Sequence, residues 1–181
     1  MRADLEARAA VLVAAARDAI AAAVEPRAPR IAAAERDPVL RADAATFVTL
    51  RQPDATLRGC IGELEARRAL IDSVRGNAVA AATRDPRFPP VTADEVAQLQ
   101  IGISVLTPPA PIRPEQIEVG RHGLLVERAP HRGVLLPEVA VDQGWDAETF
   151  LSMTCRKAGL ELEAWGDPET RVLAFETIKL P

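Results

Sequence analysis

Tyrosine is absent from this chain of 181 residues, and aromatic side chains of all kinds make up only 3% of it. Proteins that bind single-stranded nucleic acids rely largely on stacking of bases against aromatic rings, so such a surface is hard to build here. The core must instead be filled by Leu, Ile, Val and Ala. With 48% hydrophobic residues, the chain has enough of them to form a globular domain.

An excess of positive charge is also missing. The chain has 22 basic and 26 acidic side chains, which gives a net charge of −4, and the two signs are interleaved along the sequence. Proteins that bind a phosphate backbone usually carry a basic excess or a basic stripe. We therefore expect no nucleic-acid partner and no salt-sensitive binding to DNA or RNA near physiological ionic strength.

Cysteines, localisation signals and metal motifs are equally scarce. Cys60 and Cys155 can form at most one bridge, too few for the disulfide framework of a secreted protein. Charged residues such as Asp4 and Arg8 interrupt every apolar run near the N-terminus, so we expect neither a signal peptide nor a membrane partner. The expected location is the cytoplasm. With no HExxH, paired CxxC or glycine-rich phosphate loop, neither a metal nor a cofactor is expected.

The hydrophobic periodicity predicts an α+β fold in one domain, residues 1–181, with antiparallel sheets and packed helices. A long N-terminal helix within residues 1–25 carries an apolar stripe and is ended by Pro26 and Pro29. This stripe suits packing on the protein's own sheet, and it also suits a membrane surface or a partner helix. The remaining predicted elements are strands 46–51, 56–61, 100–106, 124–128, 133–136 and 171–178, and helices 66–84, a short one capped by Thr92, and one from Asp146 to Ala158.

The order of hairpin, helix and strand thus occurs twice. Arg51-x-Pro53 in the first hairpin has a counterpart in Arg128-x-Pro130 in the second. One interpretation is an internal duplication. The other is coincidence, because hairpins followed by helices are common.

The segment Leu57–Gly62 (LRGCIG) is the most unusual in the chain. On a strand, Arg58 and Cys60 point to one face while the flanking leucine and isoleucine point to the other. Gly59 allows a ligand or another backbone to approach closely. A guanidinium beside a thiol favours the thiolate, the form that attacks or ligates. A small buried cysteine in a glycine-rich strand is the alternative interpretation.

Two further segments carry candidate site residues. The prolines of Asp85–Pro90 (DPRFPP) stiffen the loop that holds Asp85 and Arg87, which can then bind a polar substrate or simply pair with each other. His122 lies between glycines and is the better partner for Cys60 as a base or a ligand. His131 is expected at a solvated hairpin tip, and Cys155 in the core.

Taken together, these motifs resemble the signature of the AMMECR family. The matching segments, in order, are Phe47–Leu50, LRGCIG, DPRFPP, 104–109 (SVLTPP), His122-Gly123-Leu124, Leu135-Leu136-Pro137, Trp145-Asp146 and 155–159 (CRKAG). The resemblance implies an intracellular domain with a larger α+β lobe, onto which the N-terminal helix packs, and a smaller, mostly β lobe within about 110–145. It implies no settled activity.

The resemblance also suggests partners. Bacterial and archaeal members of the family often accompany a radical S-adenosylmethionine protein and a dioxygenase-like protein, and are then called AmmeMemoRadiSam system protein A. This association implies a shared pathway or complex.

Three functional hypotheses are consistent with these residues. In the first, the protein is an enzyme that uses Cys60 as a nucleophile or redox thiol, tuned by Arg58 and His122, with substrate held by Gly59, Asp85 and Arg87. In the second, it is a non-catalytic module that binds a small molecule, a peptide or a protein. In the third, it regulates nucleic acid, which the acidic balance disfavours.

Overall fold

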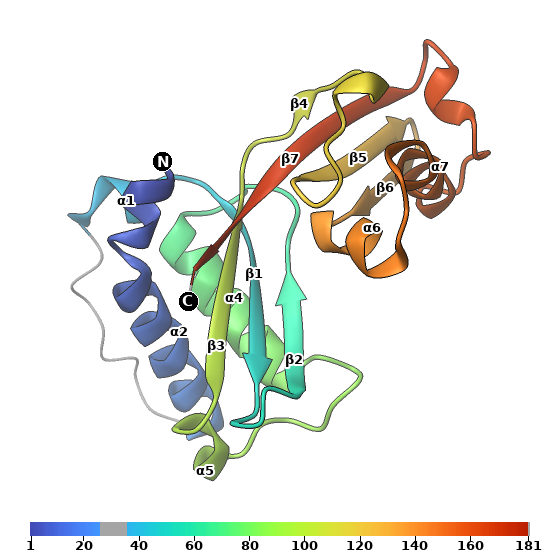
Figure 1. Ribbon diagram of the computed structural model, residues 1–181. Helices are drawn as coiled ribbons and strands as arrows, with labels where there is room; N and C mark the ends of the chain where they lie inside the picture. The colour runs from blue at the N-terminus through green and yellow to red at the C-terminus, as the bar shows by residue number, and fades with distance from the viewer. Residues whose placement is uncertain (26–35, 181) are drawn as a thin grey trace. The chain divides into compact units, whose positions relative to one another are not determined.

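In the computed structural model, residues 1–25 and 36–180 are described. They form two compact units, the first comprising Met1–Leu106 and the C-terminal residues from Ile178, the second Thr107–Thr177 (Figure 1). Strands pair in an antiparallel manner in both units, and helices pack against them. The predicted α+β class is therefore confirmed.

The N-terminal segment forms two helices where one was expected, α1 (Arg2–Glu6) and α2 (Ala9–Val24). The chain leaves helical geometry at Arg8, which serves as the N-cap of α2. The Arg8 side chain donates to the Asp4 carbonyl and to the Asp37 carboxylate, which itself caps α3 (Pro38–Arg41). The predicted stop at Pro26 and Pro29 lies outside the described residues.

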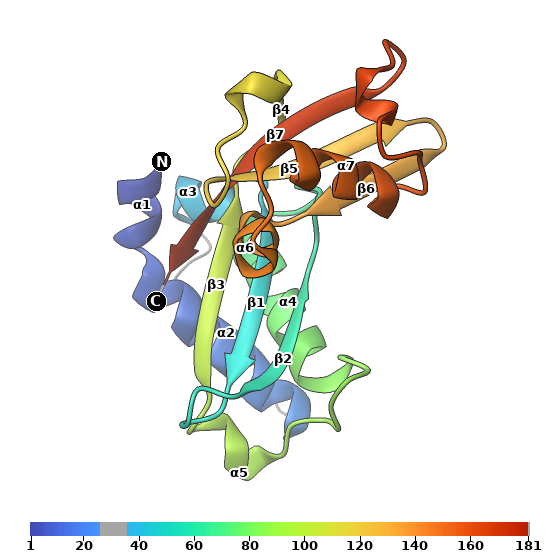
Figure 2. The ribbon, with the colours of Figure 1, turned by 45° about the vertical axis from the view of Figure 1, so that its right-hand side comes forward.

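The first unit contains a sheet in the order β2 (Leu57–Gly62), β1 (Ala45–Arg51), β3 (Gln100–Leu106), so that β2 is an edge strand. Helices α2 and α4 (Leu70–Thr83) cover one face of this sheet (Figures 1 and 2). The fully buried core lies between them and includes Leu12, Ile20, Val48, Leu50, Leu70, Val74 and Ile103. Ile178 and Leu180, at the end of β7 (Arg171–Leu180), belong to the same core.

Helix α4 begins later than the sequence predicts. Residues 66–69 stay outside the helix because their backbone bonds elsewhere: the Ala44 N–H donates to the Arg68 carbonyl, and Ala69 forms a bridge with Asp43. The capping box of α5 (Ala93–Val96), formed by Thr92 and Glu95, is confirmed.

The second unit contains β4 (Ala110–Pro111), β5 (His122–Arg128), β6 (His131–Leu135) and the first part of β7, with β5 between β6 and β7. Helices α6 (Pro137–Gln143) and α7 (Ala147–Lys157) share a core with β5 that includes Leu124, Val126, Ala140, Phe150 and Leu151. Short 3-10 turns, η2 (Pro114–Gln116) and η3 (Ala164–Gly166), complete the unit. It extends past the expected 110–145 segment because α7 packs on β6 and β7 pairs with β5.

Helix α6 was not foreseen, although its sequence carries two boundary signals. Pro137 occupies its first turn, where the missing N–H costs nothing, and Gly144 ends it with a φ of 65°. In the described part of the chain, 1–25 and 36–180, no helix is long and apolar enough to cross a membrane.

Candidate functional site

The two glycines of the LRGCIG strand are required by packing. A Cβ on Gly59 would overlap the carbonyl oxygen of Ala81 in α4. A Cβ on Gly62 would overlap the ring of Phe47 on the neighbouring strand. Only glycine lets the helix and the aromatic ring approach β2 so closely.

Arg58 is buried and bonds away from the thiol. Its Nε and Nη2 donate to the Glu95 carboxylate at 2.8 and 3.1 Å, and its Nη1 and Nη2 donate to the carbonyls of Pro89 and Pro90 at 2.8 and 3.2 Å. Such a bidentate pair uses the planar fork of the guanidinium. Arg58 therefore anchors the proline-rich segment and α5 to β2.

Glu95 has two structural roles at once. It accepts from Arg58 and, in the capping box of α5, from the Thr92 N–H at 2.8 Å. These bonds, with that from Arg58 the largest cause, lower the pKa of Glu95 to about 2. The sequence reveals the capping box but not the bond to Arg58, because the two partners lie on different elements.

Asp85 is buried and fixes the backbone of Cys60. Its carboxylate accepts the Cys60 N–H at 2.8 Å, and it also accepts from Arg87 through Nε at 2.9 Å and Nη2 at 2.7 Å. The hydrogen bond from Arg87 is the main reason why the pKa of Asp85 lies well below its usual range. Arg87 Nη2 also lies 3.4 Å from the Cys60 carbonyl oxygen.

The Asp85–Arg87 pair thus occupies the place of a further strand beside β2. Edge strands expose N–H and C=O groups that invite pairing with other chains. At Cys60, both of these backbone groups are taken by the ion pair. The structure thus shows the two side chains paired with each other, one of the two interpretations of this loop, and substrate binding by them stays a prediction.

The Cys60 thiol is half-buried, and its Sγ lies 3.3 Å from the Thr49 hydroxyl oxygen. Strand register places Thr49 opposite Cys60 on one side and opposite Gly102 on the other. The Asp85 carboxylate raises the pKa of Arg87, and the charge of a Cys60 thiolate adds to this rise. Arg87, which sequence analysis assigned to substrate, is therefore the arginine that contacts Cys60, through the backbone carbonyl of that residue.

Glu63, an acid close to the thiol in sequence, is engaged elsewhere. It accepts from Arg68 Nε at 2.9 Å and from the Ser73 hydroxyl at 2.6 Å. Ser73 continues into a buried network with Thr46 and Asn77. This network fastens the end of β2 to α4.

His122 belongs to the second unit, and its pairing with Cys60 stays a prediction. Its Nδ1 accepts the Glu118 N–H at 3.0 Å. A ring nitrogen that accepts carries no proton, so the neutral imidazole holds its proton on Nε2 and presents a donor there. The side chain lines a hollow of about 230 Å³ together with Thr107, Pro108, Pro111 and Glu176.

The other cysteine and the other histidine lie away from the signature strand in sequence and belong to the second unit. Cys155 is fully buried beside Leu151 in the core, as predicted, and burial raises the pKa of its thiol. His131 is exposed, with Nδ1 3.3 Å from the Ala158 carbonyl oxygen. Within residues 1–25 and 36–180, no group of three His, Cys, Asp or Glu side chains is arranged to hold a metal ion.

Comparison with known proteins agrees with the motifs. The family model AMMECR1 matches residues 13–180. A protein of Methanothermobacter thermautotrophicus is 49% identical over 145 residues, which cover 76% of this chain and 75% of that relative. A protein of Thermococcus gammatolerans is 48% identical over 139 residues, covering 71% of this chain and 68% of the relative.

A solved structure shares the fold. The crystal structure of an uncharacterized protein from Pyrococcus horikoshii is 40% identical, superposes with a TM-score of 0.76, and covers 92% of this chain and 87% of that one. By family model, sequence identity and fold, this chain belongs to the AMMECR1 family.

Proposed function

We propose that this protein is a non-catalytic binding module, and that its recognition surface is formed by Thr49, Cys60 and Arg87, here called the Cys60 surface. The observation that supports this most is the engagement of the ionised groups around the thiol. Asp85 bonds to Arg87 and to the Cys60 N–H, while Arg58 bonds to Glu95. These bonds make the surface rigid, which lowers the entropy cost of binding.

A thiol enzyme needs a base within hydrogen-bond reach of the sulfur. Asp85 is a poor base because Arg87 holds its pKa well below the usual range. His122, the other candidate, bonds through Nδ1 to the Glu118 backbone. The acceptors that a nucleophilic mechanism would use are thus occupied.

The ligand class is set by the groups at the surface. The Arg87 side chain is 54% exposed, and its bonds to Asp85 and Cys60 use Nε and Nη2, which leaves the Nη1 donors for a carbonyl or carboxylate. The Thr49 hydroxyl and the absence of a side chain at Gly102 suit an extended peptide or a small polar molecule. A protein from the same pathway would supply such a peptide.

A cysteine-dependent enzyme is the second candidate, and one observation favours it. Packing and hydrogen bonds account for Arg58, Gly59 and Gly62, whereas the thiol of Cys60 remains half-exposed beside the charge of Arg87. In that hypothesis Cys60 is the nucleophile or redox thiol, and His122 serves it from the second unit.

Alkylation kinetics distinguish the two candidates. Iodoacetamide applied to the folded protein should label Cys60 before Cys155, which is fully buried. For a binding module, Cys60 should react no faster than free glutathione at pH 7, whereas an activated enzyme thiol, ionised at that pH, should be labelled about tenfold faster or more. Peptide mass spectrometry reads the site, and Cys60→Ser supplies the background.

Two results would count against the proposal. A Cys60 rate about ten or more times that of glutathione at pH 7, reduced in His122→Ala, would replace the module with the enzyme. Labelling of Cys155 ahead of Cys60 would remove Cys60 from both hypotheses.

A further inference from the structure

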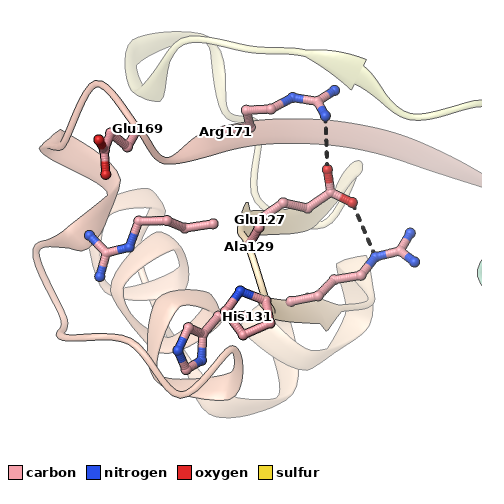
Figure 3. A pocket seen from close by; sticks show the side chains of 8 residues that line it. Glu127, Ala129, His131, Glu169 and Arg171 are labelled. Atoms are coloured by element: carbon pink, nitrogen blue, oxygen red, sulfur yellow. Dashed lines mark ion pairs between the residues drawn. The ribbon is translucent and has the colours of Figure 1, made fainter.

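Two hollows of the second unit differ in how far their polar groups are already engaged. In the hollow at the turn between β5 and β6, the Glu127 carboxylate is held by two arginines, and dashed lines mark both ion pairs (Figure 3). In the hollow of about 230 Å³ beside β7, His122 and Glu176 both keep hydrogen-bonding capacity. The residues that line this second hollow all lie within Thr107–Thr177, so an inference drawn from it does not depend on the Cys60 surface.

His122 and Glu176 are neighbours across the sheet. Strand register places them directly opposite each other on the antiparallel strands β5 and β7. The N–H and C=O groups of Glu176 both bond to Thr107, on the side away from β5, so the two residues form a non-hydrogen-bonded pair. In pairs of this kind the side chains are closest, with Cα atoms about 4.5 Å apart. The imidazole and the carboxylate therefore line the hollow side by side.

Each of the two side chains has one hydrogen-bonding group to spare. Nδ1 of His122 accepts the Glu118 N–H, which leaves the proton on Nε2, and Nε2 donates to no group of residues 1–25 and 36–180. The Glu176 carboxylate is engaged through Oε1, which lies 3.0 Å from Arg121 Nε and 2.9 Å from Arg121 Nη2. Its Oε2 has no partner in the part of the chain that the structure describes. A donor and an acceptor are thus placed next to each other.

The charges beside the hollow restrict the ligand. Arg121 is shared by two carboxylates, because its Nη1 also lies 3.0 and 3.2 Å from the two oxygens of Glu118. The three side chains together carry a net charge of −1, which repels an anion. A cation would satisfy Glu176 but would face the Nε2–H donor of His122. A neutral group that contains both an acceptor and a donor satisfies both side chains.

We propose that this hollow binds a small neutral molecule through an amide group. The amide C=O accepts from Nε2 of His122, and the amide N–H donates to the Glu176 carboxylate. Because the two protein groups are neighbours, the C=O and N–H of the ligand must lie on the same side, as they do in a primary amide or in a lactam ring. A site of this kind discriminates strongly, since a ligand that lacks either group leaves a polar side chain unpaired.

The rest of the lining suits the body of such a ligand. Pro108, Pro111 and Ile112 supply apolar surface next to the two polar groups. The volume lies below the range of sites for drug-sized molecules, about 300 to 1,000 Å³, so a single flat ring fits better than a larger compound. Both polar side chains are held in place beforehand, His122 by the Glu118 N–H and Glu176 by Arg121, which lowers the entropy cost of binding.

Titration with 2-pyridone, followed by amide chemical shifts in NMR spectra of the full chain, tests the site. This ring carries an adjacent C=O and N–H and is neutral at pH 7. Saturable shifts are expected around residues 107–112, 122 and 174–176, with a Kd on the order of 1 mM. N-methyl-2-pyridone, which lacks the N–H, should bind about tenfold more weakly or not at all. Benzoate, an anion, should also bind more weakly than 2-pyridone.

Three variants separate ligand binding from a structural role of the pair. His122→Asn keeps an acceptor for the Glu118 N–H and removes the Nε2 donor, so it should weaken 2-pyridone binding about tenfold. His122→Gln, whose longer side chain brings an amide donor to the place of Nε2, should retain more of the affinity. Glu176→Gln should weaken binding about fivefold, because an amide oxygen is a weaker acceptor than a carboxylate.

Glu115→Gln is the matched control. Glu115 is an arginine-paired glutamate of the same unit, 66% exposed and not part of the hollow, so its loss of charge should leave binding unchanged. Spectra without ligand show whether each variant is folded. The comparison of the two pyridones uses the unmodified protein and does not depend on any variant.

Four outcomes would overturn the inference. Shifts in the unmodified protein that do not saturate, or equal losses in His122→Asn and Glu115→Gln, would indicate non-specific association. Equal affinity for 2-pyridone and its N-methyl derivative would show that no N–H is recognised. Tighter binding of benzoate than of 2-pyridone would exclude the neutral amide as the ligand class.

Discussion

The two units contain the same arrangement of hairpin, helix and strand, built on β1, β2, α4 and β3 in the first and on β5, β6, α7 and β7 in the second. In each, the first hairpin strand lies between the second and the strand that comes after the helix. In each, the second hairpin strand carries a glycine under the helix. A Cβ on Gly59 would overlap Ala81 in α4, and one on Gly133 would overlap the backbone of Thr154 and Ala158 in α7.

The two units differ in the segment directly after the helix. After α4 the chain places Asp85 against the edge of β2, where it bonds to Cys60 and Arg87. After α7 the chain turns at Gly159, which has a φ of 76°. Strand β6, which precedes α7 in the sequence, begins with the exposed residues His131 and Arg132. The shared arrangement thus supports an ion pair around the buried Asp85 in one unit and a solvent-facing row of ion pairs, Glu127 with Arg132 and Arg171, in the other.

A methyl group added under each helix tests the similarity of the two units most directly. Gly59→Ala and Gly133→Ala should each lower the free energy of unfolding by about 3 kcal/mol, because the clashing atoms belong to the helix backbone and cannot rotate away. Urea denaturation measures both. Gly166→Ala, where nothing lies within 4 Å of the added carbon, should change stability by less than about 0.5 kcal/mol.

If only one of the two glycine variants is destabilised, the helices do not approach their hairpins equally. The structural equivalence of the two units would then fail at its closest contact.

Acid should lower the stability of the first unit in particular, because Glu95 loses its charge there. The bonds from Arg58, the largest cause, and from Thr92 lower the pKa of Glu95 from 4.5 to about 2, so this carboxylate contributes stability above pH 4.5 and the contribution is lost as the pH falls toward 2. Glu95→Gln should therefore cost about 2 kcal/mol at pH 7, where the buried Arg58 loses its partner, about half of that or less at pH 3, and little at pH 2.

Urea denaturation at pH 7, 4.5 and 3 shows whether the free energies of unfolding of this variant and of the unmodified protein approach each other as the pH falls. Glu115→Gln, at a side chain that is 66% exposed, is the control in the second unit and should have little effect at any pH. A constant difference between Glu95→Gln and the unmodified protein across this range would show that the charge of Glu95 is not what matters.

Removal of the Asp85 carboxylate should affect mainly one backbone amide, that of Cys60. Asp85→Ala removes the acceptor of the Cys60 N–H, so hydrogen exchange at this amide should accelerate about tenfold or more. Asp85→Asn, which keeps an acceptor oxygen but loses the charge, should give an intermediate rate. Asp167→Ala breaks the pair with Arg128 in the second unit, where the Asp167 side chain is 39% exposed, and should cost less than about 1 kcal/mol.

Unchanged exchange at Cys60 in Asp85→Ala would mean that the edge of β2 is protected by something other than the ion pair. The main distinction drawn between the two units would then be removed.

Several elements were predictable because their signals are local. Strand β3 follows the alternation of residues 100–106, and Asp146 caps α7 by accepting the Thr149 N–H at 2.8 Å. The break at Arg8 and the late start of α4 were not predictable, since Asp37 and the Asp43–Ala69 bridge create them through contacts between segments. Local propensity cannot register such contacts.

Local patterns alone predicted the order of strands β1, β2, β3, β5, β6 and β7, the core position of Cys155, and the place of the unusual strand with its glycines. The pairing of charged side chains, in contrast, depends on contacts between segments of the folded chain. Arg58 was expected beside the thiol and instead bonds to Glu95, whereas Arg87 pairs with Asp85 and contacts the Cys60 carbonyl. The physical reason is that alternation along a strand sets the face of a side chain, while its partner is set by loops that pack against that face from 25 or more residues away.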